Sequence, residues 1–233
     1  MNKRPNIIQV AILGKHSRGG TLRGGFPEII ETVWVSFTVL YVCTGNLCRS
    51  PMAELLFRGW ADPQGDVTVS SAGTKALVGH GIDHSSAAAL GQLGIDPTQH
   101  RARQFEPWMA AYSDLILTAA REHRDVVMTA LPSVYKRTFT MKEFARLVGD
   151  VPAAEPRAIV AAAGARRGHA KPVKPEEDDV ADPYRGAIKH AKSIVEEITE
   201  TVYITLATLG LAAERWGYTP PVRENRSARP APY

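Results

Sequence analysis

The sequence predicts an α/β fold in which a parallel sheet forms the middle layer of a three-layer sandwich and helices cover both faces. Three observations predict it. Strand-like and helix-like segments alternate from Phe37 onward, which is typical of parallel sheets with crossover helices. The first strand-like segment, 37–42, is continuously apolar and rich in β-branched residues, as a strand buried on both faces should be. The composition, 44% hydrophobic and 22% charged over 233 residues, is that of an ordinary globular protein.

The individual elements follow from local patterns. After strand 37–42 a loop leads into an amphipathic helix at 52–60, with Ser50 placed to cap it and Pro51 to open it. Thr140 is placed to cap a later helix. The segment 169–179 is predicted as a loop, because it holds two prolines and an acidic run. The remaining predicted elements are strands at 66–71, 114–117 and 136–140, helices at 85–93, 121–131, 141–148 and 187–213, and an alanine-rich segment of helical character at 158–166.

Both ends of the chain are expected to lie outside the folded domain, which would span 35–215. Residues 1–34 are basic and glycine-rich without a periodic apolar face, which predicts a flexible extension that is dispensable for folding and activity. Residues 216–233 are rich in proline and predict a disordered tail. No nucleic-acid-binding motif accompanies the net charge of +4, so no nucleic-acid partner is expected. No run of eighteen apolar residues exists, so no membrane span is expected either.

The two cysteines, Cys43 and Cys48, are too few for a disulfide framework or a four-cysteine zinc site. We therefore expect a reducing compartment, the cytoplasm, and neither a metal nor a cofactor. His123 stands among charged neighbours and receives no role.

The loop that follows the first strand has the chemistry of a phosphate cradle. Gly45 and Asn46 permit unusual backbone angles, and inward-pointing N–H groups together with the following helix N-terminus would bind an anion. Arg49 can clamp two phosphate oxygens with its guanidinium fork. The same positive field would stabilise a thiolate at Cys43, so that the sulfur could attack phosphorus and form a phosphocysteine intermediate. Cys48 is either a packed small side chain or the partner of Cys43 in a protective, reversible disulfide.

Four short strings resemble one known family. Residues 42–51, Val-Cys-Thr-Gly-Asn-Leu-Cys-Arg-Ser-Pro, resemble the signature of the bacterial low-molecular-weight protein-tyrosine phosphatases. Residues 71–74, 100–104 and 182–184 resemble the family's second, third and general-acid strings, in the family's order. The resemblance covers 37–211 and implies a four-stranded parallel sheet in the order 2-1-3-4, with the site at the carboxyl end of the first strand.

The resemblance also implies roles for single residues. Cys43 would be the nucleophile, Arg49 the phosphate clamp and Asp182 the acid that protonates the leaving phenolate. Ser50 would donate a hydrogen bond to the thiolate. The other implied site residues are the loop members Thr44, Gly45, Asn46, Leu47 and Cys48, the supporting Ser71 and His100, and the substrate-cleft residues Leu77 and Tyr184.

Position also favours Asp182 over the neighbouring acids. Pro183 restricts the backbone of Asp182, whereas Asp178 and Asp179 lack such a brace and are interpreted as solvated. Four features depart from the family pattern: Arg185 stands where many members have a second aromatic, residues 1–34 have no counterpart, and the other two concern Leu77 and the span 149–180. Leu77 stands where members often have an aromatic cleft wall, and the span 149–180 is longer than usual and is expected to be mainly a loop.

The predicted activity is hydrolysis of phosphotyrosine esters on proteins, and a bacterial tyrosine kinase is one candidate partner. A small-thiol-dependent arsenate reductase on the same fold is an alternative, although Pro51 and Asp182 favour the phosphatase. The thioredoxin-coupled type is excluded, because no cysteine follows Cys48. A catalytically silent phosphoprotein-binding module is a further alternative, which the presence of Cys43 and Arg49 disfavours.

Overall fold

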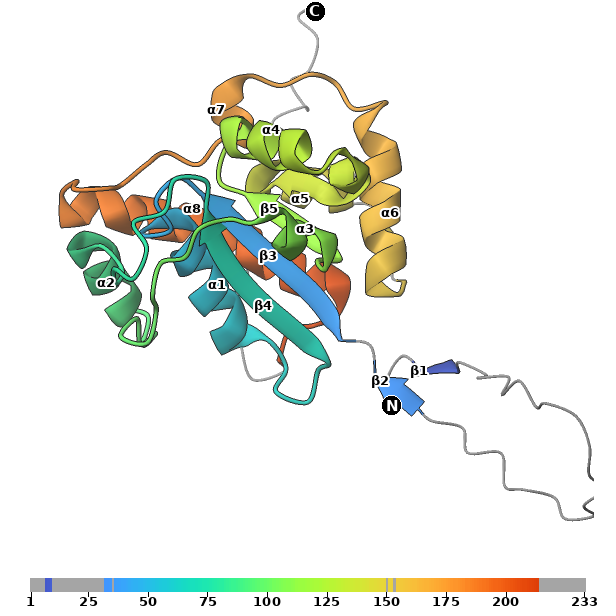
Figure 1. The fold of residues 1–233 in the computed structure, drawn as a ribbon, viewed down its shortest axis with the longest axis horizontal. Coiled ribbons are helices and arrows are strands. Elements are labelled where there is room, and N and C mark those ends of the chain that lie inside the picture. Colours follow the sequence, from blue (N-terminus) through green and yellow to red (C-terminus); the bar gives the residue numbers. More distant parts are fainter. Residues whose placement is uncertain (1–6, 10–31, 35, 150, 153, 214–233) are drawn as a thin grey trace, which may run out of the picture.

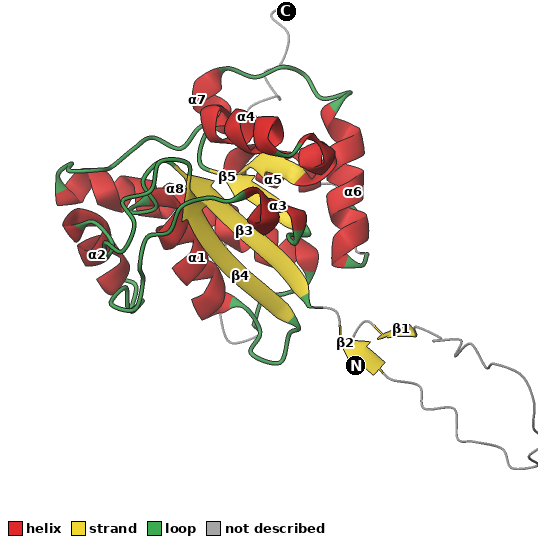
Figure 2. Cartoon of the chain, in the orientation of Figure 1, coloured by secondary structure: helices red, strands yellow, loops and turns green. Residues whose placement is uncertain are grey.

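The main sheet has four parallel strands in the spatial order β4-β3-β5-β6 (Figures 1 and 2). The strands are β3 (Phe37–Cys43), β4 (Val67–Gly73), β5 (Leu115–Thr118) and β6 (Thr138–Thr140). Counted along the chain within this sheet, the order is 2-1-3-4, so the predicted fold class is confirmed. The structure is a computed structural model that describes residues 7–9, 32–34, 36–149, 151–152 and 154–213.

The central strand β3 supplies both hydrophobic cores, because successive side chains of a strand point to opposite faces. Val39 and Tyr41 pack in one core with α1 (Arg49–Trp60), α5 (Met141–Val148) and the long helix α8 (Ile188–Leu209). Leu40 and Val42 pack in the other core, with α3 (Pro107–Ala111) and α4 (Arg121–Ala130). Figure 1 shows these two helical layers on opposite sides of the sheet.

Several helix ends differ from the sequence analysis. The first helix begins at Arg49 rather than at Pro51, with Cys48 at the N-cap position, and Ser50 does not cap it. The helix expected over 187–213 ends at Leu209, because Gly210 takes the left-handed conformation with φ of 67°. Thr140 does cap α5, in a reciprocal capping box with Glu143.

Three short helical elements have no counterpart in the sequence analysis, because each spans only one or two turns and carries no apolar period. They are α3, the 3₁₀ segment η1 (Pro132–Arg137) and α7 (Pro175–Asp178), the last of which lies in the expected loop 169–179. The predicted helix at 85–93 is observed as α2 (His84–Gly91).

The helical character predicted for 158–166 is confirmed, and the expectation that 149–180 is mainly a loop is wrong over 156–167. These residues form α6 (Pro156–Arg167), which buries Ile159, Val160 and Ala163 in the core shared with α8. Arg167, in the last turn of α6, lies over the Phe139 ring at 4.1 Å. Its Nε also donates to Oε1 of the buried Glu143 at 2.8 Å. The insertion therefore adds a packed helix to the edge of the fold.

Within the predicted N-terminal extension the structure describes two short strands, β1 (Ile7–Gln9) and β2 (Thr32–Trp34), which pair antiparallel with each other. The rest of the extension and the predicted tail at 216–233 lie outside the described residues. The flexibility and dispensability of residues 1–34 stay predictions.

Gly164 tests the packing of α6. A Cβ at this position would lie 2.4 Å from the carbonyl oxygen of Lys136, so backbone must move to accept it. We expect Gly164→Ala to lower the free energy of unfolding by about 1–3 kcal/mol, in spite of alanine's higher helix propensity. Gly168→Ala is the matched control, because a Cβ there meets only one atom, at 3.9 Å. Denaturant unfolding measures both; equal stability of the two variants would contradict the packing described for α6.

Candidate active site

The loop between β3 and α1 is tied along one side to the segment after β4. The N–H groups of Thr74, Lys75 and Leu77 donate to the carbonyl oxygens of Cys43, Thr44 and Gly45, at 2.8, 2.9 and 3.1 Å. Within the described part of the chain, the backbone N–H groups of residues 45–48 donate no hydrogen bond. They are available to an anion, in the manner of a phosphate-binding loop.

Gly73 permits this close approach of β4 to the loop. A Cβ on Gly73 would lie 2.5 Å from the carbonyl oxygen of Thr44 and 2.9 Å from the Asn46 nitrogen. Only glycine therefore fits at the end of β4, next to the point where β3 leads into the loop.

Asn46 holds the loop in shape from inside. Its backbone is left-handed, with φ of 55°, and its side chain is fully buried. Nδ2 donates to Oγ of Ser50 at 2.9 Å and to Oγ of Ser71 at 2.8 Å, while Oδ1 accepts the Arg103 N–H at 2.9 Å. Nε2 of His100 lies 2.8 Å from the Asn46 carbonyl oxygen and donates to it, which fixes the tautomer of this ring. Burial lowers the pKa of His100, so the ring is held in its neutral form at pH 7.

Glu54 and Arg103, which the sequence analysis did not assign to the site, support this network. Oγ of Ser71 donates to Oε2 of the buried Glu54 at 2.5 Å, and Nε of Arg103 donates to the Ser71 carbonyl at 2.6 Å. Arg58 pairs with Glu54 one helical turn away. The available sequence signal was the i,i+4 spacing of Glu54 and Arg58, which by itself indicates a surface pair rather than a buried anchor.

Cys43 ends β3 at the floor of the site. Its Sγ lies 3.0 Å from Oγ of Ser50, and both side chains are buried. Asn46 Nδ2 donates to the Ser50 oxygen, so the single hydrogen of that hydroxyl has two acceptors within reach, the Cys43 sulfur at 3.0 Å and the Ala72 carbonyl at 3.3 Å. Ser50 thus contributes to the site through its hydroxyl rather than as a helix cap.

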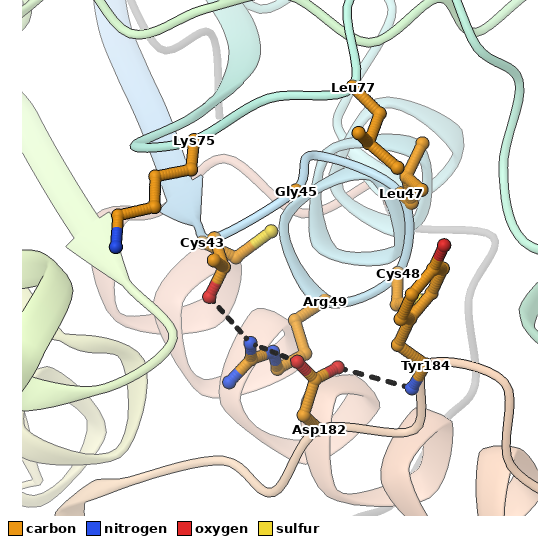
Figure 3. Close-up of a pocket in the computed structure, with 10 residues that line it drawn as sticks. Cys43, Gly45, Leu47, Cys48, Arg49, Lys75, Leu77, Asp182 and Tyr184 are labelled. Carbon is orange, nitrogen blue, oxygen red and sulfur yellow. Dashed lines mark hydrogen bonds and ion pairs between the residues drawn. The ribbon is translucent and has the colours of Figure 1, made fainter.

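Arg49 joins the loop to a segment more than 130 residues away. Its side chain is 5% exposed, and one terminal nitrogen lies 2.7 Å from Oδ2 of Asp182 (Figure 3). The other terminal nitrogen donates to the Val180 carbonyl at 3.2 Å. Oδ1 of Asp182 accepts the N–H of Tyr184 at 3.2 Å, which keeps the carboxylate turned toward the loop.

The interpretation of Asp178 and Asp179 as solvated acids is wrong. Asp178 is buried and pairs with Arg146 at 3.0 Å. Oδ1 of Asp179 accepts the N–H of Arg121 at 2.9 Å, at the start of α4. The Val180 N–H donates to the carbonyl of Ala119, the residue after β5, at 2.8 Å. These contacts anchor the segment that carries Asp182.

A cavity of about 230 Å³ opens above Cys43. Its polar floor is the loop with Arg49, and its rim combines Asp182 with apolar side chains and Lys75 (Figure 3). The lining residues are Cys43, Thr44, Gly45, Leu47, Cys48, Arg49, Lys75, Leu77, Asp182 and Tyr184. Every residue that the sequence analysis placed in the loop or cleft lines this cavity, except Asn46 and Ser50, which support it from below.

Both cysteines of the loop are free thiols. Burial raises the pKa of Cys48 to about 12, so this side chain is a neutral thiol at pH 7. A reversible disulfide between Cys43 and Cys48 stays a prediction.

His123 is a residue that the sequence analysis left without a role. The structure buries it under the loop, with Nε2 2.8 Å from Oγ1 of Thr44. The same hydroxyl accepts a hydrogen bond from Arg49 at 3.2 Å. Burial, together with the charge of Arg49, lowers the pKa of His123 to about 4. An uncharged ring therefore supports Thr44 at neutral pH, and no local pattern in the sequence indicates this contact.

The described residues contain no group of three or more His, Cys, Asp or Glu side chains arranged to hold a metal ion. Among the same residues, no helix combines the length and the apolar character that crossing a bilayer requires.

Comparison with known proteins identifies the family of this chain. The sequence model of a family described as low molecular weight phosphotyrosine protein phosphatase matches residues 38–158. A probable low molecular weight protein-tyrosine-phosphatase, EpsP of Ralstonia solanacearum, is 38% identical over 115 residues, which are 49% of this chain and 77% of that protein.

Two solved structures are similar across the domain. The YwlE arginine phosphatase of Geobacillus stearothermophilus aligns with a TM-score of 0.58 and 26% identity, over 75% of this chain and 93% of that one. The low molecular weight protein tyrosine phosphatase of T. tengcongensis aligns with a TM-score of 0.57 and 28% identity, over 74% and 99%.

The chain is thus a phosphatase of the cysteine-based class. Within that class it belongs to the low-molecular-weight protein-tyrosine-phosphatase family.

Acid should destabilise the protein through His123. In the unfolded chain this ring becomes protonated below its ordinary pKa of 6.5. In the folded protein its pKa is about 4, so the ring stays neutral until the pH falls to that value. The free energy of unfolding should therefore fall as the pH drops from 6.5 to 4, by up to about 3 kcal/mol from this group. In urea titrations across this range, His123→Asn should show a shallower pH dependence than the unsubstituted protein. His169→Asn, at an exposed position, is the control and should keep the full slope. Equal slopes for all three proteins would contradict a buried neutral His123.

Proposed function

We propose that this chain hydrolyses phosphotyrosine on proteins through a phosphocysteine intermediate formed at Cys43. The observation that carries the proposal is the convergence of three groups at one cavity. The Cys43 sulfur lies 3.0 Å from the Ser50 hydroxyl, beside the buried guanidinium of Arg49, which in turn lies 2.7 Å from the Asp182 carboxylate.

In the first step the Cys43 thiolate attacks phosphorus in line with the leaving oxygen. The S–P bond forms and the P–O bond to the aryl group breaks, with its electron pair going to the phenolate oxygen. Asp182 delivers its proton to that oxygen. The free N–H groups of residues 45–48 and the fork of Arg49 hold the three non-bridging oxygens.

In the second step water hydrolyses the phosphocysteine. The Asp182 carboxylate takes a proton from the attacking water, the new P–O bond forms and the S–P bond breaks. Its electron pair returns to the Cys43 sulfur, and the Ser50 hydroxyl stabilises the thiolate by a hydrogen bond.

The apolar rim supports an aryl phosphate as the substrate. Leu47, Leu77 and Tyr184 provide hydrophobic surface for a ring on one side of the Cys43 sulfur (Figure 3). A phosphoarginine side chain would place its guanidinium against this apolar surface, which disfavours it, because the lining offers the guanidinium only one carboxylate, Asp182. Parallel assays with phosphotyrosine, phosphoarginine and thiol-dependent arsenate reduction separate the three activities. A tyrosine-phosphorylated protein, such as a bacterial tyrosine kinase, is the proposed partner.

Cys43 and Arg49 should both be indispensable for turnover. Cys43→Ser is expected to abolish hydrolysis of an aryl phosphate while phosphate binding, measured by calorimetry, persists, because the cradle is made of backbone and arginine. Arg49→Lys should fail as well, since a lysine cannot make the bidentate contact. Vanadate should inhibit the enzyme without added metal. Retained thermal unfolding midpoints show that each variant is folded; turnover by Cys43→Ser would refute the phosphocysteine route.

Asp182→Asn should slow the reaction in proportion to the leaving group's need for a proton. We expect a loss of about 10²- to 10⁴-fold with a poor leaving group and a much smaller loss with a good one. The basic limb of the pH–rate profile should flatten. Asp179→Asn is the matched control, because it keeps an oxygen that can accept the Arg121 N–H; any loss there should not depend on the leaving group. A leaving-group-dependent loss at Asp179 would reassign the acid.

A further inference from the structure

Lys75 is a cation at the cavity rim that the proposed chemistry does not use. It belongs to the cavity lining and is exposed to solvent. Within the described part of the chain, its side chain makes no ion pair and no hydrogen bond. The two other charged side chains of the lining, Arg49 and Asp182, pair with each other. The charge of Lys75 is therefore free to act on a ligand.

The backbone of Lys75 is held in a fixed relation to the phosphate-binding loop. Its N–H donates to the Thr44 carbonyl at 2.9 Å. The next residue, Ala76, donates to Oε1 of Gln104 at 3.0 Å, and Nε2 of Gln104 returns a bond to the Thr74 carbonyl. A flexible side chain thus starts from an anchored point, which limits the region that its ammonium group can reach.

The place of Lys75 is opposite the apolar part of the rim. Figure 3 shows Leu47, Leu77 and Tyr184 on one side of Cys43 and Lys75 on the other, with its ammonium group directed away from them. A phosphotyrosine ring seated against the apolar side leaves the chain on either side of that residue to pass over the rim. A flanking side chain of the substrate can then reach Lys75.

We infer that Lys75 is a specificity-determining residue, which pairs with an aspartate or glutamate next to the phosphotyrosine of the substrate. This inference rests on the proposed function. The preferred substrate is accordingly an acidic segment. A small aryl phosphate has no group that extends past the ring, so Lys75 contributes little to its turnover.

The test compares two phosphotyrosine peptides that differ only in having glutamate or glutamine at the flanking positions. The unsubstituted full chain should prefer the acidic peptide by about two- to fivefold in kcat/KM at low salt, mainly through KM, because exposed ion pairs provide effects of this size. The preference should shrink at high salt. Lys75→Gln should remove it and Lys75→Glu should reverse it, and in Lys75→Gln the loss of kcat/KM on an aryl phosphate should be smaller than the loss on the acidic peptide. Lys171→Gln, exposed and outside the cavity lining, is the control and should keep the preference.

Each contrary result has a distinct meaning. Equal turnover of both peptides by the unsubstituted chain, or a preference that survives Lys75→Gln, overturns the inference and leaves the proposed function intact. A parallel loss on the aryl phosphate in Lys75→Gln shows that Lys75 holds the phosphate itself, which also overturns it. No turnover of either peptide refutes the proposed function together with the inference.

Discussion

The buried Asn46 is the constraint on which the site depends. An L-residue in the left-handed region costs free energy, and a buried amide costs more unless its hydrogen-bonding groups are satisfied. Here the amide joins Ser50 on α1, Ser71 on β4 and the backbone at Arg103, while His100 binds the carbonyl. One residue thus joins the loop, two secondary-structure elements and the distant segment that holds His100 and Arg103. The outer edge of the loop is tied to residues 74–77, while the N–H groups of residues 45–48 keep no hydrogen-bond partner among the described residues.

The sequence predicts the sheet and the loop well, because both depend on local patterns. The buried strand 37–42 and the strand–loop–helix string that follows it place Cys43, Arg49 and the phosphate-binding loop without reference to the rest of the chain. The long-range partners could not be derived in this way. Glu54 is a buried anchor for Ser71, but its local sequence indicates only one half of a surface ion pair. For His123 the local sequence shows only a polar residue among charged neighbours. The local sequence of Asp178 and Asp179 predicts solvated side chains, because their partners lie on α5 and α4, which are distant in the sequence.

The insertion between α5 and α8 shows the same limitation. Alanine-rich sequence indicates helix but does not reveal what the helix packs against. Besides its core residues, α6 places Gly164 against the Lys136 backbone, and Arg167 contacts both the Phe139 ring and the buried Glu143. The following segment then runs from α7 to Asp182, held at Asp178, Asp179 and Val180. The chain segment from the insertion to the Asp182 carboxylate at the cavity is therefore held by contacts along its length.

The ion pair between Arg49 and Asp182 means that a carboxylate of the protein competes with anionic ligands for the Arg49 guanidinium. A carboxylate bound to the guanidinium at 2.7 Å must be displaced before a phosphate can use the same nitrogen. The free energy of this internal pair is subtracted from the affinity for every phosphate, whether it arrives as an ester or remains as inorganic product. Substrates recover part of the loss through contacts with the rim, whereas free phosphate has none. An internal ligand of this kind weakens the binding of substrate and product equally, and its displacement would free Asp182 when the site fills.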